Sequence, residues 1–206
     1  LHKPDFTFDF YELESLVNKK TKLIIVNSPH NPSGKVFNEE ELEFIARLAV
    51  KNDLFVISDE VYEFLTFDGA NHKPISAFPG MKERTITISS TGKTFSMTGW
   101  KIGWAVASER ITKAVRSVHQ WTAFAVNTPG QHAMAAALGR LEEYLPEFRS
   151  LYQKKRDLIL SEMKETKFKA YKPFGTYFLL AGIPPEAEKI GIDFAVDLAR
   201  NYKLAA

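Results

Sequence analysis

A lysine set among small polar residues is the first candidate for chemistry in this chain. It is Lys93, in the run SSTGKTFSMTGWKIGW at residues 89–104. Its Gly-Lys-Thr tripeptide matches the end of a nucleotide-binding P-loop. That motif also requires a glycine five positions before the Gly-Lys pair, where this chain has Thr87. The residues after the lysine also lack the pattern of a helix. A P-loop is therefore disfavoured, and Lys93 is either a surface lysine or an amine in an anion-binding site.

Three further polar groups could complete such a site. Asn31 lies in the Pro- and Gly-rich stretch NSPHNPSG, which could hold its amide toward a ligand or could simply form an Asx-turn. Lys101 is the only charge in GWKIGW and is either a solvated loop lysine or a second cation. Ser90 precedes Lys93 by three residues and adds a hydroxyl.

An acid and a phenol emerge together from the stretch FVISDEVY. Asp59 follows an apolar run, and Tyr62 lies three residues further on. A carboxylate at the end of a buried strand is costly unless it meets a positive charge, although Asp59 could instead cap the next helix. An acid–base pair of Asp59 with Glu60 is disfavoured, because adjacent residues of a strand point to opposite faces.

The elements that must position these groups alternate between strands and helices. Short runs rich in Ile and Val at 23–26, 54–57, 85–89 and 103–107 predict strands buried on both faces of a mainly parallel sheet. The sequence therefore predicts an α/β fold, a three-layer sandwich. Ligands of such sheets bind at the carboxyl ends of the strands, which is where the polar groups lie.

Helix signals separate the strands. Asn38 and Glu41 form a capping-box pattern before one helix, and Ser108 is expected to cap another. Thr128 and Pro129 predict the start of a third helix, and Pro146 that of a long fourth.

The pattern changes near residue 168. Two strands, at 168–174 and 176–181, are predicted to meet around Pro173 and Gly175, with a short helix from Asp193. We therefore expect residues 1–167 to belong to one large domain and residues 168–206 to begin a smaller α+β domain.

Composition excludes several classes of protein. The net charge of +2 is too small to favour a nucleic-acid or anionic-membrane partner, and no apolar run could span a bilayer. The chain has no cysteine, which suits a cytoplasmic protein, and its five histidines lack the spacing of metal ligands, so no metal site is expected.

Taken in order, NSPHNPSGKVF, ISDEVYEF and ISSTGKTFSMTGWKIGW resemble the class I and II aminotransferases, which use pyridoxal 5'-phosphate in fold type I. The resemblance is strongest to the kynurenine aminotransferase branch, also called glutamine transaminase K or cysteine-S-conjugate β-lyase. It covers almost the whole chain and includes PFGTYF, which is similar to the start of the family's small domain.

The resemblance implies a role for each candidate residue. Lys93 matches the lysine that forms the Schiff base with the cofactor, and Asp59 matches the acid that pairs with the pyridine nitrogen. Tyr62 and Asn31 match the groups that hydrogen-bond the phenolic oxygen of the cofactor. Ser90 matches a phosphate ligand.

Lys101 matches a basic phosphate ligand that is often arginine in the family. Lysine offers a point charge in place of the planar fork of arginine, so phosphate binding is expected with a different geometry.

The family implies more than these 206 residues contain. Its members are about twice as long, so we expect a phosphate-binding loop, a ring-stacking aromatic and a substrate-binding arginine to lie outside this chain, and the chain alone to be inactive. The resemblance also implies a homodimer acting on an amino acid (of the aromatic, kynurenine or glutamine type) and a 2-oxo acid. A dedicated cysteine-conjugate β-lyase and a non-catalytic, cofactor-binding regulatory domain stay open as alternatives.

Overall fold

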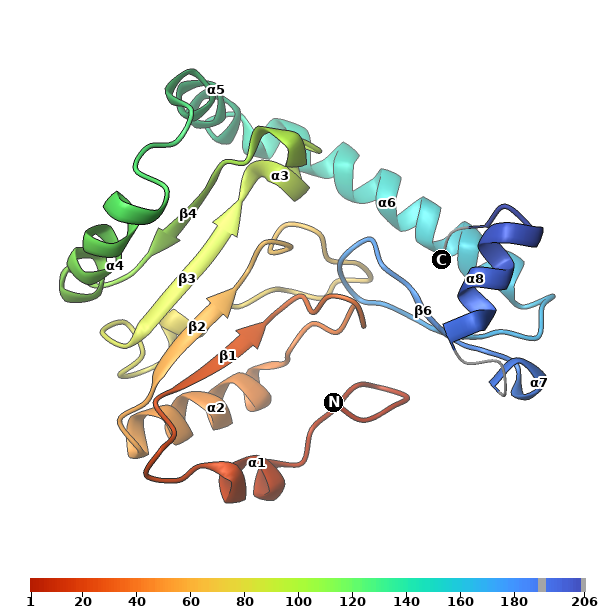
Figure 1. The fold of residues 1–206 in the computed structure, drawn as a ribbon, viewed down its shortest axis with the longest axis horizontal. Coiled ribbons are helices and arrows are strands. Elements are labelled where there is room, and N and C mark those ends of the chain that lie inside the picture. The colour runs from red at the N-terminus through yellow and green to blue at the C-terminus, as the bar shows by residue number, and fades with distance from the viewer. Residues whose placement is uncertain (189–191, 205–206) are drawn as a thin grey trace.

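A four-stranded sheet with helices on both sides organises the chain (Figure 1). The computed structural model describes residues 1–188 and 192–204. The strands are β1 (Leu23–Asn27), β2 (Phe55–Asp59), β3 (Thr85–Ser90), β4 (Gly103–Val106), β5 (Lys169–Tyr171) and β6 (Leu180–Gly182). The helices are α1 (Phe10–Leu16), α2 (Glu39–Lys51), α3 (Thr91–Thr94), α4 (Glu109–Thr122), α5 (Thr128–Leu138), α6 (Leu141–Met163), α7 (Pro185–Glu188) and α8 (Ile192–Asn201), with 3-10 turns at Ile75–Ala77 and Thr98–Trp100.

The sheet is mainly parallel, as the sequence predicts. Its order is β1-β2-β3-β4, and β1, β2 and β3 run in the same direction, whereas β4 is antiparallel to β3. The register places Asn27 opposite Asp59, and Asp59 opposite Ile88. The last residues of β1 and β2 therefore lie side by side at one edge of the sheet.

Helix α2 covers one face of this sheet and builds the main core. Asn38 caps the helix in the predicted capping box, in which its side chain accepts from the Glu41 N–H and the Glu41 carboxylate accepts from the Asn38 N–H. The core contains buried apolar side chains from α2, β1, β2, the loops between them and the segment between β2 and β3: Val26, Phe37, Leu42, Ile45, Ala46, Ala49, Leu54, Val56, Ile75 and Met81. The sandwich of α2, sheet and α4 confirms the predicted α/β fold class.

The opposite face of the sheet corrects one prediction. The strands were expected to be buried on both faces, yet Ile25 is 68% exposed, and Leu23 and Ile88 are also exposed. Alternation along β1 sends Val26 into the α2 core and Ile25 to the other side. Within the described residues, that other side is covered only in part, by α4.

Two helix starts also differ from their predictions. The cap of α5 is Asn127, whose side chain accepts from the Gly130 N–H, so Thr128 is the first helical residue. Helix α6 begins at Leu141, which leaves Pro146 inside the helix. Proline is tolerated in the first turn of a helix, but at Pro146 it removes one backbone hydrogen bond and its ring crowds the carbonyl of the residue four positions earlier. Ser108 does precede α4, but its side chain makes no capping hydrogen bond.

A second, two-stranded sheet begins close to residue 168. Strands β5 and β6 pair antiparallel, but they are shorter than predicted, and residues 172–179 between them form a loop. In Figure 1 this light-blue loop reaches toward the loops beyond β1 and β2. The division into two domains at residue 168 stays a prediction, and its residues 189–191 and 205–206 lie outside the described part.

An ion pair fixes α6 to the loop after β2. Both Nη atoms of the buried Arg156 side chain donate to Asp68, at 2.8 and 2.9 Å. The Arg156 guanidinium holds the pKa of the Asp68 carboxyl at about 2, and Lys172 adds to the effect. The ordinary value of an aspartate pKa is about 4.

This pKa shift predicts acid sensitivity. Because the folded-state pKa is lowered, the pair stabilises the fold above pH 4, and that stabilisation is lost as the pH falls from about 4 to about 2. Allowing for the partial exposure of Asp68, we expect Asp68→Asn to lower the free energy of unfolding by about 1 kcal/mol at pH 6. Urea denaturation at pH 6 and pH 3 measures it. The exposed Asp5→Asn is the control, and an equal loss at both pH values would contradict the assignment.

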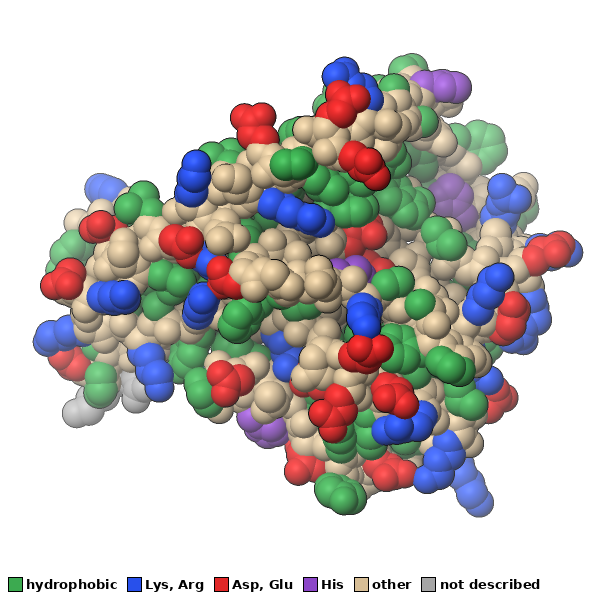
Figure 2. Space-filling view, turned by 180° about the vertical axis from the view of Figure 1, so that it is seen from behind, with side chains coloured by type: hydrophobic (Ala, Val, Ile, Leu, Met, Phe, Trp, Pro, Cys, Tyr) green, Lys and Arg blue, Asp and Glu red, His purple; other side chains and the backbone are tan. Residues whose placement is uncertain are grey.

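The surface shows no concentration of charge on the face seen from behind. Figure 2 shows acidic and basic side chains interspersed there. Among the helices of the described ranges, none has the length and apolar character that crossing a membrane requires.

Candidate active site

The predicted residues gather around the carboxyl ends of β1, β2 and β3. Asn27 ends β1, Asp59 ends β2 and Ser90 ends β3. The Asn27 side chain joins two of the loops, because its Nδ2 donates to the Asp59 carbonyl at 3.0 Å and its Oδ1 accepts from the Asn31 N–H at 2.8 Å. The parallel strands thus place Asp59 and the loop that carries Asn31 at the same edge of the sheet.

Asp59 is held at the end of β2 with its carboxylate half-buried. One carboxylate oxygen accepts from the Val61 N–H at 3.3 Å. The neighbouring Glu60 points elsewhere and is buried, where it accepts from Ser58 Oγ at 2.7 Å and pairs with His72 Nε2 at 2.8 Å. The expectation that Asp59 and Glu60 do not share one ligand agrees with these contacts.

Tyr62 carries a polar atom that the described residues leave unsatisfied. The residue is 2% exposed, and its hydroxyl has no partner within hydrogen-bond distance among the described residues, although the Tyr177 hydroxyl is near enough to raise its pKa. Burial raises the pKa of the Tyr62 phenol well above its ordinary range, and Tyr177 and the negative charge of Asp59 act in the same direction. A buried hydroxyl without a partner lowers the stability of the fold. Its donor and acceptor positions remain available for a hydrogen bond to a ligand, which would remove that cost.

Lys93 lies in the single turn of α3, directly after β3, and is half-buried. Its Nζ lies 5.6 Å from the centre of the Tyr177 ring, and the ring centres of Tyr177 and Tyr62 are 5.3 Å apart in an edge-on arrangement. Tyr177 therefore contacts both residues, and it brings the amine and the phenol into one neighbourhood.

Ser90 directly precedes α3, and Lys101 follows the 3-10 turn Thr98–Trp100. Ser90 is half-buried beside two close backbones, since a Cβ on Gly103 would lie 3.1 Å from Ser90 Cβ and one on Gly92 would lie 3.5 Å from Ser90 Oγ. Lys101 is exposed and takes the left-handed conformation, with φ of 55°. Among the residues that the structure describes, Lys101 makes no ion pair, so its amine is free for an anion.

Asn31 is exposed, and only its backbone N–H has a hydrogen bond within the described residues. Its side chain lies on the loop that Asn27 fixes, but the structure does not show it in contact with Tyr62. Its predicted partnership with Tyr62 therefore stays a prediction.

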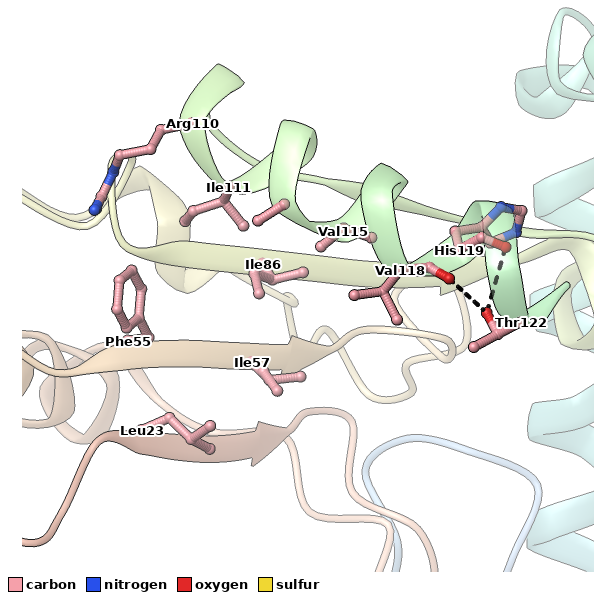
Figure 3. Close-up of a pocket in the computed structure, with 11 residues that line it drawn as sticks. Leu23, Phe55, Ile57, Ile86, Arg110, Ile111, Val115, Val118, His119 and Thr122 are labelled. Carbon is pink, nitrogen blue, oxygen red and sulfur yellow. Dashed lines mark hydrogen bonds between the residues drawn. The ribbon is translucent and has the colours of Figure 1, made fainter. Parts of the chain in front are cut away.

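A large apolar groove lies away from these residues. It has a volume of about 640 Å³ and is formed by one face of the sheet and by α4 (Figure 3). Leu23, Phe55, Ile57 and Ile86 line it from the strands, and Ile111, Val115 and Val118 from the helix. The Thr122 hydroxyl at one end already donates within α4. The groove offers an apolar surface and lacks the acid, amine and phenol of the strand ends.

Two residues with a part in this arrangement were not predicted as site residues. Asn27 could have been found, because it is a polar residue at the end of an apolar strand. Tyr177 had no such signal, since it lies in the aromatic run PFGTYF, which reads as an ordinary strand. Its contacts with Tyr62 and Lys93 join parts of the chain more than 80 residues apart.

Comparisons with known proteins place the geometry in context. A family model described as aminotransferase class I and II matches residues 1–204. A kynurenine–oxoglutarate transaminase of Dictyostelium discoideum is 47% identical over 173 residues, which cover 82% of this chain and 40% of the relative. A methionine aminotransferase of Escherichia coli is 36% identical over 206 residues, which cover all of this chain and 53% of the relative.

A solved structure shows the same arrangement of elements. The N-succinyldiaminopimelate aminotransferase from Mycobacterium tuberculosis superposes with a TM-score of 0.90 and 39% sequence identity. The superposition covers 97% of this chain and 52% of that one. The chain thus spans about half the length of the proteins that it matches.

Proposed function

We propose, because this chain belongs to the class I and II aminotransferase family, that the whole protein is a transaminase that uses pyridoxal 5'-phosphate. It would move an amino group between an amino acid and a 2-oxo acid. The chain would supply the residues that hold the ring and the phosphate of the cofactor.

One observation carries this proposal. The Tyr62 hydroxyl is buried with no partner within hydrogen-bond distance among the described residues, at the strand ends where Asp59 and Lys93 also emerge. A phenol that lacks a partner, a carboxylate and an amine are the donor set that this cofactor requires, so the residues fit it. When bound, the cofactor withdraws electrons from the α-carbon of the substrate.

Lys93 would hold the cofactor covalently through its Nζ and, once released, move a proton. We propose that Nζ takes the α-proton of the amino acid as general base and later returns it as general acid. Lys93 is half-buried, and its amine lies 5.6 Å from the centre of the Tyr177 ring.

Asp59 would bind the protonated pyridine nitrogen. A carboxylate held at a strand end is pre-oriented, and its charge stabilises a cationic partner more strongly than the same charge would in water. Tyr62 and Asn31 would donate to the phenolic oxygen, while Ser90 and Lys101 would bind the phosphate and transfer no proton.

The substrate class and the assembly belong to the same proposal. The relatedness to kynurenine–oxoglutarate transaminases supports kynurenine as the amino donor, and donors of the aromatic or glutamine type are predictions from the family resemblance. A homodimer is a prediction from the family resemblance, and a cytoplasmic location is a prediction from the absence of cysteine.

Assays of the whole protein test the proposal. Absorbance of the cofactor bound to the purified protein comes first, followed by transfer from kynurenine, glutamine, phenylalanine and aspartate to several 2-oxo acids. Release of pyruvate from a cysteine conjugate without amino transfer would indicate a β-lyase, and cofactor binding without any turnover would indicate a regulatory domain. Neither alternative is favoured by the relatives reported above, which are all named as transaminases.

Removing the Tyr62 hydroxyl is expected to stabilise the cofactor-free protein and to weaken its binding of the cofactor. Tyr62→Phe deletes a buried group that has no hydrogen-bond partner among the residues that the structure describes, so we expect the free energy of unfolding to rise by about 1 kcal/mol. The same change removes a hydrogen bond to the cofactor and should weaken its binding about ten-fold. Denaturation of the cofactor-free protein and titration with pyridoxal 5'-phosphate measure the two effects. The exposed Tyr11→Phe is the control, and a loss of stability with unchanged binding would refute the role of Tyr62.

A further inference from the structure

The segment 173–178, PFGTYF, is bound to both loops that carry the predicted ligands of the phenolic oxygen. The N–H groups of Phe174 and Gly175 donate to the Gly34 carbonyl at 2.9 and 2.8 Å. The Thr176 N–H donates to the Leu65 carbonyl at 3.0 Å, and the Phe174 carbonyl accepts from the Phe67 N–H at 2.8 Å. We call residues 173–178 the strap.

Close backbone approaches fix the strap on the loop that carries Asn31. Gly34 has a φ of +70°, and a Cβ there would lie 2.1 Å from Pro173 Cβ. A Cβ on Gly175 would lie 2.7 Å from Pro29 Cβ and 3.0 Å from the Leu65 carbonyl oxygen. Both positions therefore need glycine, and no side chain could separate the three segments without moving them.

The first residue and the middle of the strap are anchored as well. Arg156 Nη1 donates to the Pro173 carbonyl at 3.1 Å, and Thr176 is fully buried. Tyr177 then lies against the Tyr62 ring on one side and within 5.6 Å of the Lys93 amine on the other.

We propose that the strap is a positioning element: it fixes the loop of Asn31 relative to the loop of Tyr62, and it lays the Tyr177 ring over the Lys93 amine. The inference rests on the proposed function only in naming the ligand. Its physical content is that Gly34, Gly175 and Tyr177 hold the cofactor-ring side of the site in place, while the phosphate side at Ser90 and Lys101 does not depend on them.

Glycine substitutions test the strap through binding. We expect Gly175→Ala in the whole protein to weaken pyridoxal 5'-phosphate, measured by absorbance titration, about ten-fold or more. Binding of inorganic phosphate, measured by calorimetry, should stay within two-fold, because the strap does not contact Ser90 or Lys101. Gly139→Ala is the matched control, since a Cβ there meets no atom closer than 3.4 Å. Equal losses for both ligands, or no loss for either, would overturn the proposal.

Two substitutions of Tyr177 provide a second test, which requires neither a change at a glycine nor the cofactor. In cofactor-free protein, Tyr177→Leu should speed the reaction of Lys93 with an amine-specific reagent about five-fold, followed by mass spectrometry, because the covering ring is gone. Tyr177→Phe keeps the ring and should react at the wild-type rate. If Gly175→Ala does not fold, this pair decides, and equal rates in all three proteins would refute the strap. A wild-type protein that binds no pyridoxal 5'-phosphate yet shows the labelling difference would refute the proposed function alone.

Discussion

Replacing Lys93 with alanine is expected to abolish transamination by the whole protein. The substitution removes the only group proposed to hold the cofactor covalently and also the base that moves the α-proton. Each role alone is worth orders of magnitude in rate, so kcat/KM should fall by at least about 10⁴-fold. Steady-state assays with the best amino donor measure the loss, and the absorbance of covalently bound cofactor should disappear with it.

One further variant separates the reactive amine of Lys93 from its positive charge, and a second, at another lysine, serves as the control. Lys93→Arg keeps a cation in the same place but offers no reactive amine, so it should be as inactive as Lys93→Ala. Lys113→Ala, on the exposed side of α4, removes a lysine that makes only a surface ion pair with Glu109 and should retain full activity. Turnover of Lys93→Ala near the wild-type rate would end the assignment of this residue.

The edge of the sheet where these residues meet could be predicted from the sequence because the signals there are local. Each apolar strand ends in a polar residue, Asn27, Asp59 or Ser90, and parallel strands bring such ends together whatever the rest of the chain does. The capping box of α2 is equally local, and it fixed the start of that helix correctly.

The strap could not be predicted, because its contacts join distant parts of the chain. The sequence predicts two strands that meet around Pro173 and Gly175, so residues 173–178 were expected to form that junction and the start of the second strand. Their backbone groups are instead paired with Gly34, Leu65 and Phe67, which lie more than 100 residues earlier. Only the glycines gave a hint, since Gly34 and Gly175 are needed where backbones approach closely.

The exposed face of the sheet was mispredicted for a different reason. A run such as Leu23–Asn27 is apolar on both faces, which is typical of a strand covered on both sides. The apolar pattern predicts that both faces of the strand are covered. Within the described residues, however, α4 alone covers the face opposite α2, and it leaves Ile25 exposed. The apolar pattern indicates that both faces of a strand need to be covered, but it does not indicate how much of the family's length a chain contains. This chain spans about half the length of its relatives.

Replacing Asp59 with alanine is the second change with a large expected effect. Among the described residues, the Asp59 carboxylate accepts one hydrogen bond, from the Val61 N–H. Its main proposed partner is the protonated nitrogen of the cofactor ring. Its loss should weaken pyridoxal 5'-phosphate binding and lower kcat by at least about 10²-fold, because an oriented charge in a shielded site acts mainly on the transition state.

The isosteric variant distinguishes charge from shape at position 59. Asp59→Asn keeps the side-chain volume and can still accept from the Val61 N–H, but it carries no charge, so its kcat should fall nearly as far as that of Asp59→Ala. Its binding of the cofactor should suffer less, because the ring still finds a polar partner. The exposed Asp5→Ala is the control. Kinetics of Asp59→Asn that match the wild type would mean that the carboxylate does not face the ring, and Asp59 would then be only the residue that orders the turn between β2 and Tyr62.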